Sequence, residues 1–295
     1  MKTLRDIGED ALIERLTGLV PQAADPMAAP GDDCAVIDQG HPTLLLLKTD
    51  ALVEQVHFLR SAPARDVGWK ALARVVSDFA AMGGKPEHFL VTLALPGEME
   101  IGWVEDFYRG MGDCMQRFGG FLAGGETSGV PTGSAAVISI AATGSVPRGK
   151  VVLRSTASPG DVLFVTGTLG GSIQGKHLTF TPRVEAAEWL VNHHKPTAMM
   201  DLSDGLGKDL PRMAAASGCG FRVVEADLPV TPGSTSAEAI GDGEDFELLF
   251  CIAESAVAAL QAAWPFGELP LTRIGRMTPT GEGSTLTGGW EHFRG

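Results

Sequence analysis

Acidic residues beside small residues recur along the chain, mostly where predicted strands end, and they are the side chains best suited to chemistry. They occur in GDDCA (31–35), KTD (48–50), VSD (76–78), GGETS (124–128), DLSDG (201–205) and DGEDFE (242–247). A single motif of this kind usually forms a turn or caps a helix, and Asp204 could also pair with Lys208 one helical turn later. Asp78 is harder to explain in this way, because it lies in an apolar helical stretch where a lone carboxylate is costly to desolvate.

Several carboxylates gathered in one cleft would repel each other unless divalent cations lay between them. Oxygen ligands in that number suit Mg²⁺, which commonly bridges to substrate phosphates. Backbone amides of glycine-rich turns can approach phosphate oxygens closely, and the chain contains 38 glycines. The motifs together therefore predict a Mg²⁺-dependent enzyme that uses ATP.

Two other binding patterns are less convincing. The segment GGSIQGKH (170–177) has the spacing of a P-loop, but His177 stands where a Ser or Thr would bind Mg²⁺. The string DLSDGLGKDL resembles a calcium loop, yet aligning Gly205 with the invariant glycine puts Met200 first and Pro211 last, which excludes an EF-hand. The seven histidines show no HxxxH or HxH spacing, so zinc chemistry has no support.

The composition limits the classes of partner. A net charge of −13 argues against nucleic acid or an anionic membrane, because both require a basic face. The longest apolar stretches are much shorter than the ~20 residues that a membrane helix needs. The first residues, MKTLRDIGEDALIERL, are typical of a charged amphipathic helix, and the four cysteines lack CxxC spacing. We therefore expect a cytoplasmic protein without disulfides, whose polyanionic substrates arrive with cations.

The acidic motifs must be positioned by an α/β (α+β) framework. A length of 295 residues suits two domains. Strand-like runs such as TLLLLKT, FLVTLALP and AAVISIAATG alternate with helical patterns, and a second alternating series begins at DVLFVTG. The segment 145–161 is rich in Pro, Gly, Ser and basic residues, which is typical of a linker. The predicted domains are residues 1–148 and 149–295.

Taken in order, nine segments that cover almost the whole chain resemble the thiamine-monophosphate kinase family. They are GDDCAVI, TDALVEQVHF, KALARVVSDFAAMGGKP, GGETS, TGTLGGS, HLTFTPRV, DLSDGLGKDL, DGEDFELLF and GWEHF. That family shares a superfamily with aminoimidazole-ribonucleotide synthetase and selenophosphate synthetase. The resemblance implies the two-domain fold of that superfamily, with mixed sheets flanked by helices and a homodimer formed by the N-terminal halves. It also implies ATP as co-substrate, Mg²⁺, and thiamine monophosphate as phosphoryl acceptor.

The resemblance also assigns roles by position. The implied metal ligands are Asp33, Asp50, Asp78, Glu126, Asp201 and Asp204, of which Asp33, Asp50, Asp78 and Asp204 are expected to be catalytic. The implied ATP contacts are Gly125, Glu126, Arg154 and Ser203. The implied contacts of thiamine monophosphate are His57, Glu244 and Trp290. An indole face and a carboxylate are sensible neighbours for the cationic thiazolium ring.

Two alternatives remain open. The chain has Lys48 and Glu126 where the family usually has a hydroxyl residue and Asp, so a paralogue that binds nucleotide or thiamine phosphate without turnover is one of them. The other is a different ATP-dependent enzyme of the same superfamily. Selenophosphate synthesis is disfavoured, because no Cys precedes the GDD motif.

Overall fold

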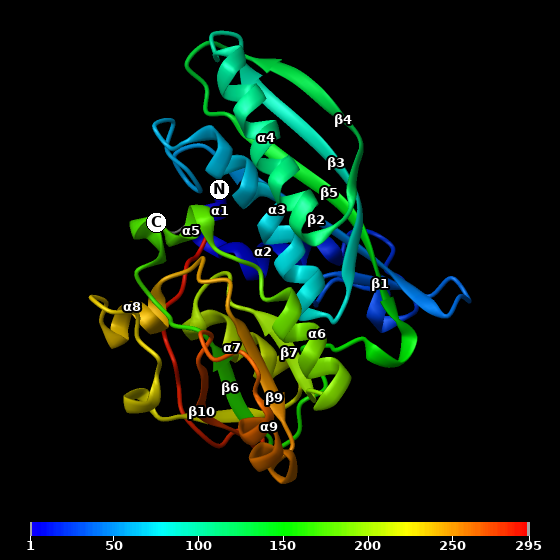
Figure 1. Ribbon diagram of the computed structural model, residues 1–295, viewed down its shortest axis with the longest axis vertical. Coiled ribbons are helices and arrows are strands. Elements are labelled where there is room, and N and C mark those ends of the chain that lie inside the picture. Colours follow the sequence, from blue (N-terminus) through cyan, green and yellow to red (C-terminus); the bar gives the residue numbers. More distant parts are fainter. Residues whose placement is uncertain (1, 294–295) are drawn as a thin grey trace.

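The first half of the chain forms a five-stranded sheet, the upper one in the computed structural model, which describes residues 2–293 (Figure 1). Its strands are β1 (Ala35–Ile37), β2 (Thr43–Val53), β3 (Lys85–Pro96), β4 (Phe121–Val130) and β5 (Val137–Pro147), in the order β1-β2-β5-β3-β4. The sheet is mixed, because β3 and β4 run parallel while the other neighbours are antiparallel. Buried and exposed residues alternate along β5, so one face of the sheet meets a core.

Two long helices, α3 (Ala64–Ala81) and α4 (Ile101–Phe118), pack against each other and against this sheet (Figure 1). The two helices approach so closely that only glycine fits at the crossing. A Cβ atom at Gly110 would lie 1.8 Å from the carbonyl oxygen of Arg65, and one at Gly68 would meet the backbone of α4 in the same way. Because α3 contacts the sheet, α4 and the second half of the chain, most of its residues are buried.

The second half forms another five-stranded sheet, in the lower part of Figure 1. Its strands are β6 (Val162–Thr166), β7 (Ala198–Asp201), β8 (Gly220–Val223), β9 (Leu248–Ile252) and β10 (Leu271–Thr278), in the order β7-β9-β6-β10-β8. All neighbouring strands of the described residues are antiparallel. Every residue of β6 and β9 is buried, and the rings of Phe164 and Phe250 stack at 5.6 Å between centroids. Apart from Thr166, both strands are made of apolar residues without alternation, as suits strands that are covered on both faces.

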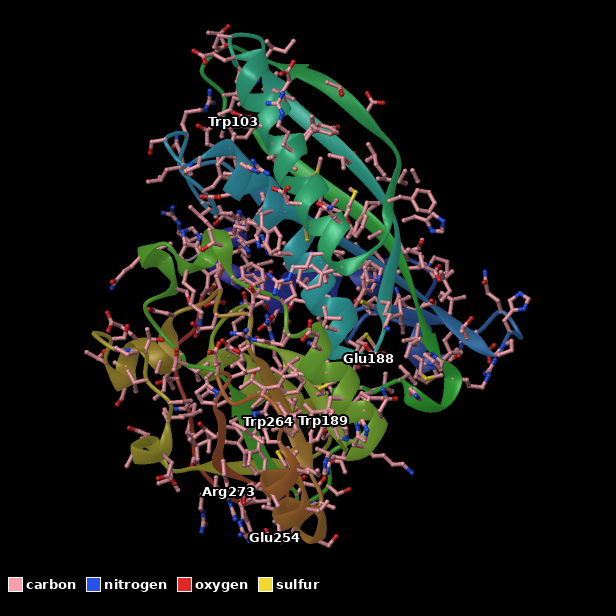
Figure 2. All side chains as sticks on the ribbon, in the orientation of Figure 1. Trp103, Glu188, Trp189, Glu254, Trp264 and Arg273 are labelled. Carbon is pink, nitrogen blue, oxygen red and sulfur yellow. The ribbon has the colours of Figure 1, made fainter. Side chains whose placement is uncertain are left out.

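Helix α6 joins the two halves. The helices of the second half are α5 (Lys176–Thr179), α6 (Val184–His193), α7 (Leu206–Ala216), α8 (Ser236–Gly241) and α9 (Val257–Ala263). One side of α6 packs against α3, and Ala80 and Ala81 of α3 belong to the same apolar cluster as α6, β6 and β9. Elsewhere on α6, Trp189 meets Trp264 edge to face, with 5.5 Å between ring centroids (Figure 2).

The N-terminal segment is attached to the second half. The single amphipathic helix expected here is divided into α1 (Leu4–Ile7) and α2 (Glu9–Thr17), because Gly8 between them adopts a φ of 74°. Glu9 accepts a hydrogen bond from Lys208 of α7 at 2.8 Å. The remaining short helices are the 3₁₀ turns η1 (Pro26–Ala28), η2 (Arg148–Lys150), η3 (Ser172–Gln174), η4 (Glu225–Asp227) and η5 (Glu254–Ala256).

The predicted α/β (α+β) fold class is confirmed, but two acidic motifs were wrongly expected at strand ends. KTD (48–50) lies inside β2, and GGETS (124–128) lies inside β4, a strand that the sequence did not indicate. Glycines disfavour strands in general. At Gly125 a glycine is required, because a Cβ atom would lie 2.1 Å from the carbonyl oxygen of Val91 on the paired strand β3.

Three further expectations concern the chain as a whole. Within residues 2–293, no helix has both the length and the apolar character needed to cross a membrane. The four cysteines are free thiols, as their spacing indicated. The division into residues 1–148 and 149–295 stays a proposal, to which we add that the first sheet ends at Pro147 and the second begins at Val162.

The crossing of α3 and α4 generates a prediction about stability. Gly110→Ala should lower the free energy of unfolding by about 2 kcal/mol or more, because the new methyl group would overlap a backbone carbonyl and push the helices apart. Gly112→Ala is the matched control, since a Cβ atom at Gly112 of the same helix meets nothing within 4 Å. It should raise stability by roughly 0.5–1 kcal/mol. Urea unfolding of both variants checks this, and equal effects would contradict the crossing geometry.

Candidate functional site

Three of the predicted acidic residues come together between the two halves of the chain. One carboxylate oxygen each of Asp33, Asp78 and Asp201 lies within 4.8 Å of the other two, and all three residues are buried. Asp33 precedes β1, Asp78 lies near the C-terminal end of α3, and Asp201 ends β7. We call these three residues the carboxylate cluster. It depends on the packing of α3 against both halves, because its members come from distant parts of the sequence.

Because the carboxylate cluster is buried, three negative charges within it are unfavourable. Burial and the neighbouring Asp33 raise the pKa of Asp201 to about 7, and burial raises the pKa of Asp78 well above its usual value. The Oδ2 atoms of Asp33 and Asp201 are buried and make no hydrogen bond among the described residues. Unpaired buried oxygens of this kind are costly unless another group binds them. The cluster therefore fits a hard divalent cation such as Mg²⁺, which prefers carboxylate oxygens.

Two cationic side chains border the carboxylate cluster. Lys48 on β2 places its Nζ atom 2.6 Å from Oδ1 of Asp78. Arg154 places Nη2 2.5 Å from Oδ1 of Asp33, and its backbone N–H donates to Asp32. The predicted ATP contact Arg154 thus lies beside the predicted metal ligand Asp33. Burial and Asp33 raise the pKa of Asp32 to about 6, although Arg154 opposes this rise.

A stripe on α3 connects the carboxylate cluster to a cavity. Lys70, Arg74 and Asp78 follow one another at four-residue spacing, which places them on one face of the helix. Asp78 belongs to the cluster, while Arg74 lines the cavity and lies 3.1 Å from Asp50. Lys70 binds Glu244 of the cavity wall at 2.7 Å. The face of α3 that carries these charges therefore borders both places.

The cavity has a volume of about 230 Å³ and contains all three predicted contacts of the acceptor, His57, Glu244 and Trp290. Ser203 and Asp204 line it too. The segment from Asp201 to Asp204 therefore belongs to both places, since Asp201 is in the carboxylate cluster and the cavity wall begins two residues later. We call this space the acceptor cavity.

Lys70 is a site residue that the sequence reading missed. Its side chain is fully buried, and its Nζ atom donates to the carbonyl oxygen of His57 at 2.6 Å and lies 2.8 Å from Nδ1 of His177. Burial alone would raise the pKa of Glu244, but His177 and Lys70 bring it down to about 2. Burial lowers the pKa of Lys70 itself to about 8. A lysine on the buried face of a helix is as unusual as Asp78, and the same argument would have identified it.

The carboxylate of Glu244 is thus already paired. Its Oε1 atom, however, is buried and makes no hydrogen bond among the described residues. His57 faces the cavity as a weak base, because burial and the nearby Arg74 lower its pKa to about 4. The Nδ1 atom of His57 accepts a hydrogen bond from the backbone N–H of Val53 at 3.0 Å.

Asp204 lies in the acceptor cavity and outside the carboxylate cluster. Lys208 and Arg212 contact its carboxylate at 3.1 Å and 2.6 Å, so the predicted pairing with Lys208 is present. Asp204 does not cap the following helix, because α7 begins after Gly205 without a side-chain cap. Asp209, whose pKa burial raises to about 8, instead accepts the backbone N–H groups of Ser203 and Asp204.

Asp50, Gly125 and Glu126 lie outside the carboxylate cluster as well. Asp50 forms an ion pair with Arg74. Its negative charge also contributes to the raised pKa of Asp78. Gly125 and Glu126 are exposed on the edge strand β4. The structure therefore joins three of the six predicted metal ligands directly and leaves Asp50, Glu126 and Asp204 apart.

Lys176, the lysine of the P-loop-like segment, has structural partners. Its Nζ atom donates to the carbonyl oxygen of Thr168 at 3.0 Å and lies 3.4 Å from Glu247. Glu247 is fully buried and is held by Arg183 through two hydrogen bonds of 2.7 Å and 2.5 Å. Lys176 is thus engaged by acceptors of the protein itself, and the expectation that this segment is not a P-loop stays a prediction.

Comparison with known proteins places this geometry in context. Residues 31–146 match the family profile described as AIR synthase related protein, N-terminal domain, and residues 174–287 match the corresponding C-terminal domain. A thiamine-monophosphate kinase from Rhodopirellula baltica is 36% identical over 288 residues, which cover 91% of this chain and 89% of the relative. The Escherichia coli K12 protein of that name is 34% identical, covering 94% and 92%. A solved structure described as AaThiL complexed with AMPPCP and TMP has a TM-score of 0.85 at 30% identity, covering 99% of both chains.

The raised pKa of Asp201 predicts how stability depends on pH. Its folded-state pKa of about 7 exceeds the ordinary value of 3.8, so the folded state holds this proton more tightly than the unfolded state. The stability that this tighter proton binding contributes is fully present below about pH 4 and is lost as the pH rises through 7. The loss is at most about 4 kcal/mol. Without metal, Asp201→Asn should lose less stability than the parent between pH 4 and 8. Mg²⁺ should restore stability at pH 8 in the parent more than in the variant.

Chemical denaturation at several pH values measures both effects. Asp227→Asn is the control, because Asp227 is exposed and lies in η4, away from the carboxylate cluster. Its pH dependence should follow that of the parent. If the free energy of unfolding changes with pH in the same way for Asp201→Asn and the parent, Asp201 does not titrate as described.

Proposed function

The chain belongs to the thiamine-monophosphate kinase family, and we propose that it transfers the γ-phosphoryl group of ATP to the phosphate of thiamine monophosphate, giving thiamine diphosphate and ADP. One observation carries this proposal. The carboxylate cluster and the acceptor cavity adjoin through the segment 201–204, so a cation bound to one lies beside a substrate bound in the other. A kinase needs this arrangement to bring two anionic substrates together.

The chain has no need of a catalytic base in this reaction. A phosphate monoester has a second pKa near ~6 and is already a nucleophilic anion at neutral pH. Positioning and charge compensation are then the main tasks. Mg²⁺, as part of the proposal, would be held by Asp33, Asp78 and Asp201 and would supply positive charge to the phosphates. Arg154 beside Asp33 adds a permanent positive charge on the ATP side, and Arg74 adds one in the cavity.

The remaining predicted residues keep their proposed roles. They are Asp50, Glu126 and Asp204 as further metal ligands, Asp33, Asp50, Asp78 and Asp204 as catalytic residues, and Gly125, Glu126 and Ser203 as ATP contacts. In the acceptor cavity, Trp290 offers its indole face to the thiazolium cation. The ion pair with Lys70 already compensates the charge of Glu244, so its unpartnered Oε1 atom is better suited to accept an N–H group of the substrate.

A homodimer is part of the proposal. Strand β4 pairs only with β3 within the described sheet, and nearly all of its residues are exposed. Phe121 and Leu122 on β4, and Leu90 on β3, are 58%, 43% and 48% exposed. An exposed edge strand with large apolar side chains favours pairing with a second copy. A cytoplasmic location completes the proposal, since the four cysteines are free and ATP is a substrate.

The direct test of the proposed function is product formation. Purified protein with ATP, Mg²⁺ and thiamine monophosphate should form thiamine diphosphate and ADP in equal amounts, as chromatography would show. Omitting Mg²⁺ should abolish the reaction. Binding of both substrates without product would instead support a paralogue without turnover, and release of phosphate without thiamine diphosphate would support another ATP-dependent reaction.

Trp290 generates a prediction about acceptor binding. Its side chain is 46% exposed, so a cation–π contact should contribute about 1 kcal/mol. Trp290→Leu should raise the Michaelis constant for thiamine monophosphate about fivefold and leave that for ATP nearly unchanged. The melting temperature should change little, because the bonds of Trp290 to Asp204 and Lys208 use backbone atoms.

Trp264→Leu is the matched control for this measurement. Trp264 is only partly exposed and donates from Nε1 to the carbonyl oxygen of Leu269 at 2.8 Å, in the apolar cluster of the second half. The Trp264→Leu variant should have a lower melting temperature than the parent and unchanged Michaelis constants for both substrates. If Trp290→Leu behaves like Trp264→Leu, the indole only anchors the C-terminal segment.

A further inference from the structure

Lys48 lies where a cation would be expected to bind the carboxylate cluster. Its Nζ atom is 2.6 Å from Oδ1 of Asp78, and 22% of its side chain is exposed. This distance is only slightly longer than the ~2.1 Å at which Mg²⁺ binds oxygen, so the ammonium group occupies the place from which a cation would bind that side of Oδ1. Asp50, on the same strand, lies near enough that its negative charge helps to raise the pKa of Lys48. The ammonium group therefore lies between two of the six predicted metal ligands.

The formal charges around the carboxylate cluster point the same way. Five carboxylates gather there, those of Asp32, Asp33, Asp50, Asp78 and Asp201. Three side chains with permanent positive charge contact them: Arg154 contacts Asp32 and Asp33, Arg74 contacts Asp50, and Lys48 contacts Asp78. With all five carboxylates ionised, two formal negative charges remain, which one divalent cation compensates. Replacing Lys48 by a neutral residue would leave three.

The unpaired oxygens show where that one cation belongs. Oδ2 of Asp33 and Oδ2 of Asp201 are buried without a hydrogen-bond partner among the described residues, whereas Oδ1 of Asp78 is engaged by Lys48. Asp201 has no contact with Lys or Arg within the described chain that qualifies as an ion pair. The open side of the cluster is thus formed by Asp33 and Asp201.

We propose that the ammonium group of Lys48 takes the place of a second divalent cation at Asp78, so that the protein without nucleotide binds one divalent cation on the Asp33 and Asp201 side. The inference rests on the proposed function only in taking the carboxylate cluster as the metal site. A built-in cation stays in place when metal is absent, so Lys48 also holds the cluster together in the metal-free protein. A neutral, short side chain at position 48 opens the second position.

Counting bound Mn²⁺ tests the proposal without any activity measurement. Mn²⁺ prefers the same oxygen ligands as Mg²⁺ and is visible by electron paramagnetic resonance. Without nucleotide, the parent should bind about one Mn²⁺ per chain in the tight class, and Lys48→Ser about two. Lys48→Arg keeps the positive charge and should bind as the parent does. Lys85→Ser is the matched control, because Lys85 pairs with Glu188 on the surface and is 60% exposed.

Melting temperature is the second readout. In metal-free buffer, Lys48→Ser should melt earlier than the parent, and Mn²⁺ should raise its melting temperature by more than it raises that of the parent. A variant that folds only with Mn²⁺ supports the proposal for the same reason. A variant that stays unfolded with Mn²⁺, or one that folds and binds no more Mn²⁺ than the parent, overturns it.

These outcomes are separate from those of the proposed function. If no thiamine diphosphate forms but Lys48→Ser gains a cation, the proposed reaction fails and the inference on Lys48 holds. If thiamine diphosphate forms and the count does not change, only the inference fails.

Discussion

Several carboxylates lie close together and away from water, and the structure must compensate their negative charge. Asp33, Asp78 and Asp201 come from three distant segments and have oxygen atoms within 4.8 Å of one another. Such a group persists only if positive charge compensates it and if the surrounding packing prevents the segments from separating. Lys48 and Arg154 supply part of the charge, while burial and the neighbouring Asp33 still raise the pKa of Asp201.

Helix α3 is the element that meets this constraint. Its apolar side chains pack against the first sheet, Gly68 lets α4 approach, and its C-terminal end lies on α6 of the second half. With the helix fixed on three sides, its charged stripe is fixed too. Lys70 contacts Glu244 in the wall of the acceptor cavity, and Asp78 is part of the carboxylate cluster. Arg74 lies between them along the helix. Fold and site are thus linked through one helix, and substitutions that tilt α3 should affect both.

Much of this arrangement can be read from the sequence, but not all of it. Strands such as β2 and β6 and the helical period of α3 are local patterns, and Asp78 stands out because a charge within an apolar helix demands a partner. Lys70 has the same property and could have been found. Strand β4 could not, because Gly124 and Gly125 are typical of turns and the need for glycine arises from contact with β3. The position of Asp204 also depends on tertiary structure, because Arg212, which contacts Asp204, also contacts Asp10 of the N-terminal helix α2.

The proposal that the carboxylate cluster holds a divalent cation beside the acceptor cavity, on the side of Asp33 and Asp201, can be tested directly. Anomalous diffraction from crystals grown with Mn²⁺ and a non-hydrolysable ATP analogue locates the cation directly. We expect a Mn²⁺ peak within about 2.0–2.3 Å of carboxylate oxygens of Asp33 and Asp201, with Lys48 still in contact with Asp78. Tight Mn²⁺ peaks found only elsewhere, for example between Asp204 and Asp209, with no cation at Asp33 and Asp201, would contradict it.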